Sequence, residues 1–233
     1  VQTRAVLTAI LPAAISPLSH TNKVLMKAVA VTPTLKKVGI IEHPRPELHR
    51  DDEVKIRTID VGICGTDREI CTFVYGDPPA GSQHLVLGHE AMGEVIEVGS
   101  KVKHLKAGDF VVPSVRRPCR DEDCLACKAN LQDFCSTGTY VERGIKGHHG
   151  FMTESFVEQE QYLTHVPATL KNVAVLMEPL TIAEKGLAQA WATQKRLPWV
   201  RNYDGSRPTG KGLNAVILGA GPIGILGAMT MKA

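Results

Sequence analysis

Four of the six cysteines in the 233-residue chain lie within 17 residues, and this cluster constrains the fold more than any other feature. They are Cys119, Cys124, Cys127 and Cys135, separated by four, two and seven residues. Four thiolates in a short loop can complete a tetrahedral zinc site with no open position, which would hold together a lobe (residues 116–136) that lacks a core of its own. An iron–sulfur cluster is the alternative. The crowding favours metal over disulfides, and with it a reducing, cytoplasmic compartment.

The residues around this lobe have the pattern of a β-rich domain. Short apolar or alternating runs, separated by Pro, Gly and Asp, extend from residue 26 to about residue 112, and residues 53–61 show the clearest alternation. Many short strands with frequent turns predict a compact β-barrel or sandwich. After the lobe, the adjacent His148 and His149 would point to opposite sides of an extended chain, so we interpret them as loop residues that do not share a metal.

A second set of metal-binding residue types comprises Cys64, His89 and Glu90, with Thr66 two residues after the thiol. Zinc binds Cys, His and carboxylate side chains, and a catalytic zinc leaves one position open for water or substrate. Glycines flank both segments, as expected where the backbone must turn tightly to direct a ligand. The 24 residues between Cys64 and His89 do not form a zinc-finger spacing. From these residues alone, a buried Cys and a capping His-Glu pair remain the alternative.

The end of the sequence has the order strand, Gly-x-Gly-x-x-Gly, helix. A helix predicted from Glu178 to about Arg196 and a polar loop (197–210) lead to the apolar run 213–218. The motif that follows is Gly219, Ala220, Gly221, Pro222, Ile223 and Gly224. In this context the glycines allow backbone N–H groups to approach a dinucleotide pyrophosphate at the helix N-terminus. A glycine-rich turn of some other α/β unit is the alternative.

The residue that selects between NAD and NADP is expected about 20 positions after the glycine motif. The sequence ends at Ala233. We therefore expect an incomplete dinucleotide domain, and little or no dehydrogenase activity from this chain alone.

Composition and the first residues exclude several other classes. The net charge of +3 is small and spread over the chain, so we expect no nucleic-acid partner. The apolar run 5–15 is too short to span a bilayer, so we expect no membrane partner. Because Met26 opens a strand-like segment, we interpret residues 1–25 as a non-native or disordered extension; a cleaved signal peptide is the alternative.

With these motifs, residues 26–233 resemble the zinc-dependent medium-chain dehydrogenase/reductase superfamily, and within it the archaeal-type glucose 1-dehydrogenases. The specific matching segments are Gly62-Ile-Cys-Gly-Thr-Asp-Arg-Glu-Ile70, Leu85-Val-Leu-Gly-His-Glu-Ala91 and Gln194-Lys-Arg-Leu-Pro198. The resemblance implies a mixed α/β chain with three parts: a GroES-like β-barrel catalytic domain (26–178), a linking helix and loop (179–210), and the first strand, turn and helix of a Rossmann domain (211–233).

The resemblance also implies an activity: oxidation of the C1 hydroxyl of D-glucose, or a related aldose, to the aldonolactone, with hydride transfer to NADP or NAD. It implies a catalytic zinc on Cys64, His89 and Glu90, approached by Glu178, and a second, structural zinc on the four clustered cysteines. Thr66 would hydrogen-bond the reacting hydroxyl, and Glu142 and Glu178 would bind the sugar. The partners would be an aldose and a nicotinamide dinucleotide, and the full-length enzyme would be a homo-oligomer, a dimer or tetramer.

There are three departures from the family pattern: the two missing polar contacts leave the substrate open, and the longer gap means that the geometry of the lobe must differ. Ile182 and Val115 stand where polar sugar contacts are expected, and the first gap of the cysteine lobe has four residues where relatives more often have two. Another aldose such as galactose or xylose therefore remains an alternative, as does another alcohol or polyol such as sorbitol, threonine or a secondary alcohol. The second alternative is a non-catalytic zinc-bound module, which predicts one zinc per chain instead of two.

Overall fold

The computed structural model describes residues 24–194, 196–197 and 214–232. Most of the extension expected at residues 1–25, and all but the first residue of the loop expected at 197–210, lie outside these residues. The described helices are α1 (Gly65–Cys71), α2 (Leu125–Lys128), α3 (Met177–Gln194) and α4 (Pro222–Lys232), with the 3-10 segments η1 (Pro33–Leu35), η2 (Gln132–Phe134), η3 (Glu160–Tyr162) and η4 (Ala168–Leu176).

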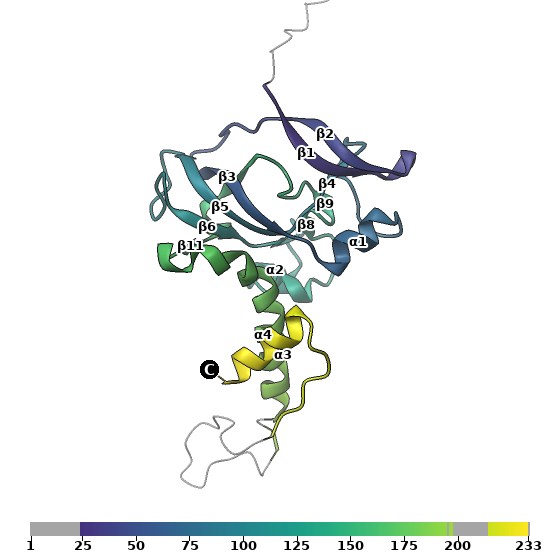
Figure 1. Cartoon of the computed structure of the whole chain (residues 1–233), viewed down its shortest axis with the longest axis vertical. Helices are drawn as coiled ribbons and strands as arrows, with labels where there is room; N and C mark the ends of the chain where they lie inside the picture. Colours follow the sequence, from purple (N-terminus) through teal and green to yellow (C-terminus); the bar gives the residue numbers. More distant parts are fainter. Residues whose placement is uncertain (1–23, 195, 198–213, 233) are drawn as a thin grey trace, which may run out of the picture.

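A five-stranded antiparallel sheet forms the centre of the β-rich part (Figure 1). In spatial order its strands are β10 (Ser155–Gln159), β3 (Glu53–Gly62), β5 (Glu90–Val98), β6 (Phe110–Pro113) and β11 (Leu163–Val166). Burying each large apolar side chain of its core contributes about 1.5–3 kcal/mol. This core consists of Val54, Ile56, Ala91, Val95, Leu105, Val111, Phe151 and Phe156.

Two three-stranded sheets complete the β-rich part. One has the order β2 (Lys37–Pro44), β1 (Leu25–Thr32) and β4 (Leu85–Val86), and the other has β7 (Arg116–Arg117), β8 (Val141–Arg143) and β9 (Gly147–His148). The first sheet joins the segment that leads into β10, because Ala28 bridges Thr153 and the N–H of Val29 donates to the carbonyl of Met152 at 2.9 Å. Backbone hydrogen bonds thus link the first sheet to the segment that enters the central sheet, as expected for a β-barrel.

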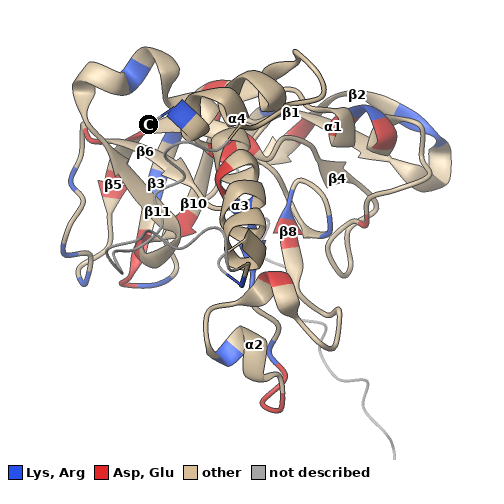
Figure 2. Cartoon of the chain, turned by 90° about the horizontal axis from the view of Figure 1, so that it is seen from below, with Lys and Arg blue, Asp and Glu red and all other residues tan. Residues whose placement is uncertain are grey.

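The helices lie outside the barrel. Helix α3 extends away from the sheets, and α4 packs along it (Figure 1). The cysteine lobe with α2 projects from the body, and basic and acidic residues are interspersed along the chain (Figure 2). Within the described residues, none of the helices is both long and apolar enough to cross a membrane.

Two local expectations are wrong. His148, expected in a loop, is the last residue of β9, because it pairs with Arg143 of β8. The other expectation is a strand. Residues 214–218 of the predicted strand 213–218 have no strand structure, and Leu218 is 94% exposed. A strand requires a hydrogen-bonded neighbour, and none of the described strands lies beside this run. The helix predicted after the glycine motif is present as α4.

Candidate metal and dinucleotide sites

The structure brings Cys64, His89 and Glu90 together. One donor atom from each lies within 4.8 Å of the others. Cys64 caps the N-terminus of α1, where its sulfur accepts a hydrogen bond from the N–H of Thr66 at 3.3 Å. His89 immediately precedes β5, and Glu90 is the first residue of that strand. A thiol, an imidazole and a carboxylate at this separation match the ligand set of a zinc ion with an open fourth position.

Two glycines make room for these ligands. Gly62 pairs with Glu90 in the β3–β5 ladder, and a Cβ at Gly62 would overlap a carboxylate oxygen of Glu90. Gly88 has φ +88°, and a Cβ there would lie 2.6 Å from the side chain of Met152. Only glycine adopts this backbone conformation without strain. The close approach of β3 to β5 therefore depends on the absence of a side chain beside the donor atoms.

Asp67 is a functional residue that the sequence interpretation did not single out. It completes the capping box of α1 by accepting the N–H of Cys64 at 3.0 Å, and it also accepts the N–H of Gly88 at 3.3 Å. Its other neighbour is Nδ1 of His89, at an ion-pair distance of 3.6 Å. A carboxylate behind a histidine orients the ring for metal binding and makes it a stronger ligand. The sequence signal for this role is an acidic residue three positions after Cys64, which is the spacing of a capping box.

The charges of this site are strongly coupled. His89 is 4% exposed, and although burial opposes its charged form, Asp67 and Cys64 outweigh burial and raise the pKa of His89 to about 9. Burial also opposes ionisation of Asp67, but His89 and the N–H groups of Cys64 and Gly88 lower the pKa of that carboxyl overall. Because nitrogen binds a metal through its lone pair, a metal at this site must displace the proton from His89.

Glu178 lies beside this cluster without belonging to it. It is in the first turn of α3, and its carboxyl is close enough to His89 and Glu90 to interact with them electrostatically. Burial raises the pKa of Glu178, and burial likewise raises that of Glu90. Both carboxyls are therefore easier to protonate than exposed glutamates.

Glu142 lies in a different sheet and is held by an arginine. Its Oε1 accepts two hydrogen bonds from Arg116, at 2.9 and 2.7 Å, and Arg116 also donates to Asp133 at 2.9 Å. The chain directly after this strand reaches the candidate metal site at Gly144, where a Cβ would overlap the carbonyl oxygen of Gly88. Glu142 is thus two positions before Gly144, which contacts the backbone of Gly88, the residue before His89.

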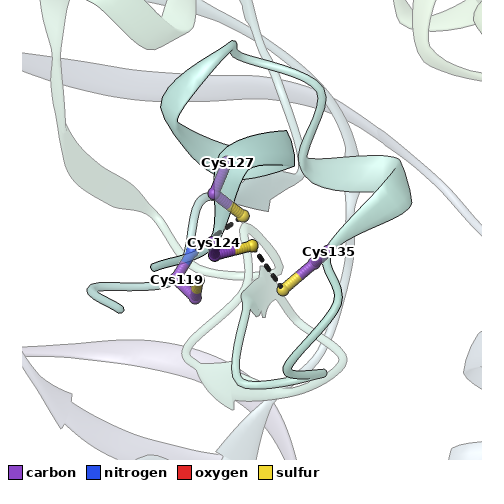
Figure 3. Close-up of side chains that lie close together, drawn as sticks. All are labelled: Cys119, Cys124, Cys127 and Cys135. Atoms are coloured by element: carbon purple, nitrogen blue, oxygen red, sulfur yellow. Dashed lines mark hydrogen bonds between the residues drawn. The ribbon is translucent and has the colours of Figure 1, made fainter. Parts of the chain in front are cut away.

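The four clustered cysteines converge, as Figure 3 shows. Their sulfur atoms lie within 4.8 Å of one another, and those of Cys124 and Cys135 are 3.9 Å apart. Sulfurs on a tetrahedral zinc lie about 3.8 Å apart, given zinc–sulfur bonds of about 2.3 Å. Hydrogen bonds from the Cys127 backbone and from Ser136 lower the pKa of the Cys124 thiol, which favours the thiolate that metal binding needs. The longer first gap of the lobe therefore does not prevent convergence.

The glycine motif forms a turn at the start of α4. Gly219 has φ +109°, and a Cβ at Gly224 would overlap the carbonyl oxygen of Gly219. These two positions are where the turn requires glycine. The turn presents the N-terminal N–H groups of α4, as the dinucleotide motif does. It borders a cavity of about 450 Å³ that Ile182 and Leu187 of α3 also line.

Comparisons with known proteins agree with this geometry. Residues 50–168 match the model of the alcohol dehydrogenase GroES-like domain. The glucose 1-dehydrogenase of Methanocella arvoryzae is 43% identical over 210 residues, which cover 89% of this chain and 54% of that protein. The glucose dehydrogenase of Haloferax mediterranei, solved in complex with NADP, Zn and gluconolactone, is similar with TM-score 0.68 and 40% identity over 76% of this chain and 49% of that chain.

A more distant structure has the same architecture. Galactitol-1-phosphate dehydrogenase from Escherichia coli is similar with TM-score 0.68 and 25% identity, over 89% of this chain and 52% of that chain. The chain spans about half the length of the curated relatives it matches. The domain match and the similarities confirm the predicted fold class, and the chain therefore belongs to the alcohol dehydrogenase GroES-like domain family.

Proposed function

We propose that this chain is the zinc-binding part of an NAD(P)-dependent dehydrogenase that oxidises the C1 hydroxyl of D-glucose, or a related aldose, to the aldonolactone. The observation that carries the proposal is the convergence of Cys64, His89 and Glu90 within 4.8 Å, with Asp67 behind the histidine. A zinc ion on these three residues would supply Lewis acidity that makes the substrate hydroxyl easier to ionise. The 43% identity to a glucose 1-dehydrogenase supports the substrate class.

The protein side chains would orient the sugar and accept its proton. In the proposal, the half-buried Thr66 hydrogen-bonds the reacting hydroxyl and passes its proton toward solvent. Glu178, whose pKa burial raises, faces the metal cluster from α3 and binds a neighbouring sugar hydroxyl. Glu142 has one oxygen occupied by Arg116, and the other oxygen remains to accept a hydrogen bond from the sugar.

The dinucleotide would bind at the glycine turn. The N–H groups at the start of α4 would hold the pyrophosphate, because a helix N-terminus favours an anion and the glycines admit its close approach. The motif residues in this role are Gly219, Ala220, Gly221, Pro222, Ile223 and Gly224. Both NADP and NAD fit this proposal.

Two apolar residues support a second candidate function. Ile182 is 52% exposed beside the glycine turn, and Val115 packs against the interior. Both side chains are apolar, so neither can make the hydrogen bond to a sugar hydroxyl that a polar residue would make. A site built to pair with hydroxyls rejects analogues that lack them, and each missing polar contact weakens that selection. The second candidate is therefore a zinc dehydrogenase for another alcohol or polyol.

A substrate panel tests the proposal on a protein in which this sequence is followed by a complete dinucleotide domain. The panel contains D-glucose, D-galactose, D-xylose, sorbitol, threonine and 2-propanol, each with NAD and with NADP. We expect an aldose to have the highest kcat/KM and Cys64→Ser to lower it by at least about a hundredfold. Preference for an alcohol without an anomeric centre would favour the second candidate, and undiminished turnover by Cys64→Ser would reject both.

Two further parts of the proposal concern the cellular compartment and the oligomeric state of the enzyme. All six cysteines are unpaired, which supports a reducing compartment such as the cytoplasm. We propose a homo-oligomer, a dimer or tetramer, and sedimentation analysis of the same protein would test this state.

A further inference from the structure

Three histidines from distant parts of the sequence meet beside the sheet of β2, β1 and β4. They are His43 in β2, His84 just before β4, and His149 directly after β9. One ring nitrogen of each lies within 4.8 Å of the others, and Nε2 of His84 is 3.3 Å from Nδ1 of His43. The ring of His84 stacks on that of His149, with centroids 5.0 Å apart.

These distances match a metal site. Two nitrogens bound at about 2.0–2.1 Å to a tetrahedral zinc lie about 3.3 Å apart. All three rings are half-buried, so each can reach an ion without being sealed from solvent. The cluster contains no carboxylate or thiolate, and imidazole-only sites select late transition metals over Ca²⁺ and Mg²⁺.

The three rings are also poised as neutral ligands. Burial lowers the pKa of His43 and of His84, and burial together with the neighbouring histidines and Arg143 lowers the pKa of His149 to about 4. A lowered pKa favours the neutral imidazole that metal binding needs. The backbone orients His149, because the N–H of Val86 donates to its Nδ1 at 3.2 Å.

We propose that His43, His84 and His149 form a third metal site, for a divalent late transition-metal ion such as Zn²⁺, Co²⁺ or Ni²⁺, with a fourth position open to solvent. The site is weaker than the two thiolate-containing sites, because it has only neutral ligands and because the metal competes with the Val86 hydrogen bond at His149. It would be filled when metal is supplied and emptied by dialysis.

An ion at this site would cross-link three segments that are far apart in the sequence. It would connect β2, an edge strand of its sheet, to the approach to β4 and to the segment that leads into the central sheet. A cross-link that closes long loops stabilises the folded state by restricting the unfolded chain. The proposed role is structural, and it shares no ligand with Cys64, His89 and Glu90 or with the four-cysteine lobe.

The test uses Co²⁺ as the probe, added to protein whose thiolate sites are first filled with Zn²⁺. We expect the wild type to bind one equivalent of Co²⁺, with d–d absorption bands of nitrogen ligation and without a sulfur-to-cobalt charge-transfer band. Loss of a residue that only orients a ligand weakens metal binding roughly tenfold or more. Loss of a direct ligand should weaken metal binding at least as much. His84→Gln should therefore raise the Kd for Co²⁺ at least tenfold.

The matched control is His165→Gln, which removes an exposed histidine outside the cluster and should leave the Kd unchanged. His43→Gln, at the edge strand, is the second variant, and circular dichroism checks that both variants fold. Absence of the extra equivalent in the wild type would overturn the proposal without reference to any variant. So would a charge-transfer band, which would place the ion on thiolates, or a Kd in both cluster variants equal to that of the control.

Discussion

At the scale of single residues, the proposed zinc site depends on residues that are not themselves metal ligands: Asp67, which contacts the ligand segments, and Gly62, which has no side chain. Asp67 accepts hydrogen bonds from the backbone of Cys64 and Gly88 and faces Nδ1 of His89, so one carboxylate positions the thiol segment and the imidazole segment together. Gly62 supports the third ligand by leaving room for the Glu90 carboxylate.

Asp67→Asn tests the positioning role. The amide keeps the size of the side chain and one acceptor oxygen but removes the negative charge that strengthens the imidazole as a ligand. We expect the affinity for zinc at the Cys64 site to fall about 10–100-fold, as for other residues behind a metal-binding histidine. Competition with a chromophoric chelator measures this affinity. Asp109→Asn, which changes an aspartate paired with the exposed Lys106, is the control. Equal affinities in the two variants would remove Asp67 from the site.

Gly62→Ala tests the close approach of β3 to Glu90. The new Cβ would overlap the carboxylate, so we expect Glu90 to move and the zinc content to fall from two ions per chain toward one, with the four-cysteine site still filled. Gly65→Ala is a matched control three residues away, where a Cβ meets nothing within 4 Å. Elemental analysis after dialysis gives the counts, and a full complement of zinc in Gly62→Ala would contradict the steric account.

At the scale of elements, one buried carboxylate joins strands from two sheets. Glu158 in β10 is 6% exposed and accepts hydrogen bonds from Arg117 of β7 at 2.5 Å and from Arg143 of β8 at 3.0 Å. Burial opposes its ionisation, but the two arginines outweigh burial and lower the pKa of Glu158. Removing one member of such a network leaves the others buried and unpaired, which typically costs about 3–5 kcal/mol.

Glu158→Gln should therefore lower the free energy of unfolding by about 3 kcal/mol near pH 7. Because the pKa of Glu158 is lower in the folded than in the unfolded state, its stabilisation is present above the unfolded pKa, about 4.5, and is lost as pH falls through the folded pKa. The difference in the free energy of unfolding between wild type and variant should therefore shrink below about pH 4.5. Urea unfolding at pH 7 and pH 3.5 measures it.

The control for this network is an ion pair with one exposed member. Lys55 and Glu97 approach to 3.8 Å with the glutamate side chain 56% exposed, so Glu97→Gln should cost less than about 1 kcal/mol. A Glu158→Gln cost that is equally small, or that is the same at both pH values, would show that the buried network does not stabilise the junction of the sheets.

At the scale of the whole molecule, local patterns predicted the elements better than the contacts between them. The strands at residues 26–31 and 53–61 and the helix after Glu178 appear near their predicted bounds, because alternation and capping are local signals. The strand at 213–218 does not form in its described part, because pairing depends on a neighbour that local pattern cannot supply.

The same difference between local patterns and long-range contacts applies to the candidate sites. The convergence of the four cysteines could be expected from their spacing. The pairing of Glu142 with Arg116, 26 residues away, could not, because it depends on the register between β7 and β8. The meeting of His43 with His149 could not either, because it depends on how segments from separate sheets pack. The interpretation of His148 and His149 as loop residues is wrong for His148, which is the last residue of β9, and holds for His149, which follows that strand. His149 joins a cluster with histidines from two other segments.

The central claim is that Cys64, His89 and Glu90 hold a zinc ion in addition to the ion on the four cysteines. Cys64→Ser tests it most directly, because serine keeps the helix N-cap of α1 while removing the thiolate. We measure zinc per chain by elemental analysis after dialysis against metal-free buffer. We predict two ions in the wild type and one in Cys64→Ser. The same zinc content in both proteins would contradict this prediction.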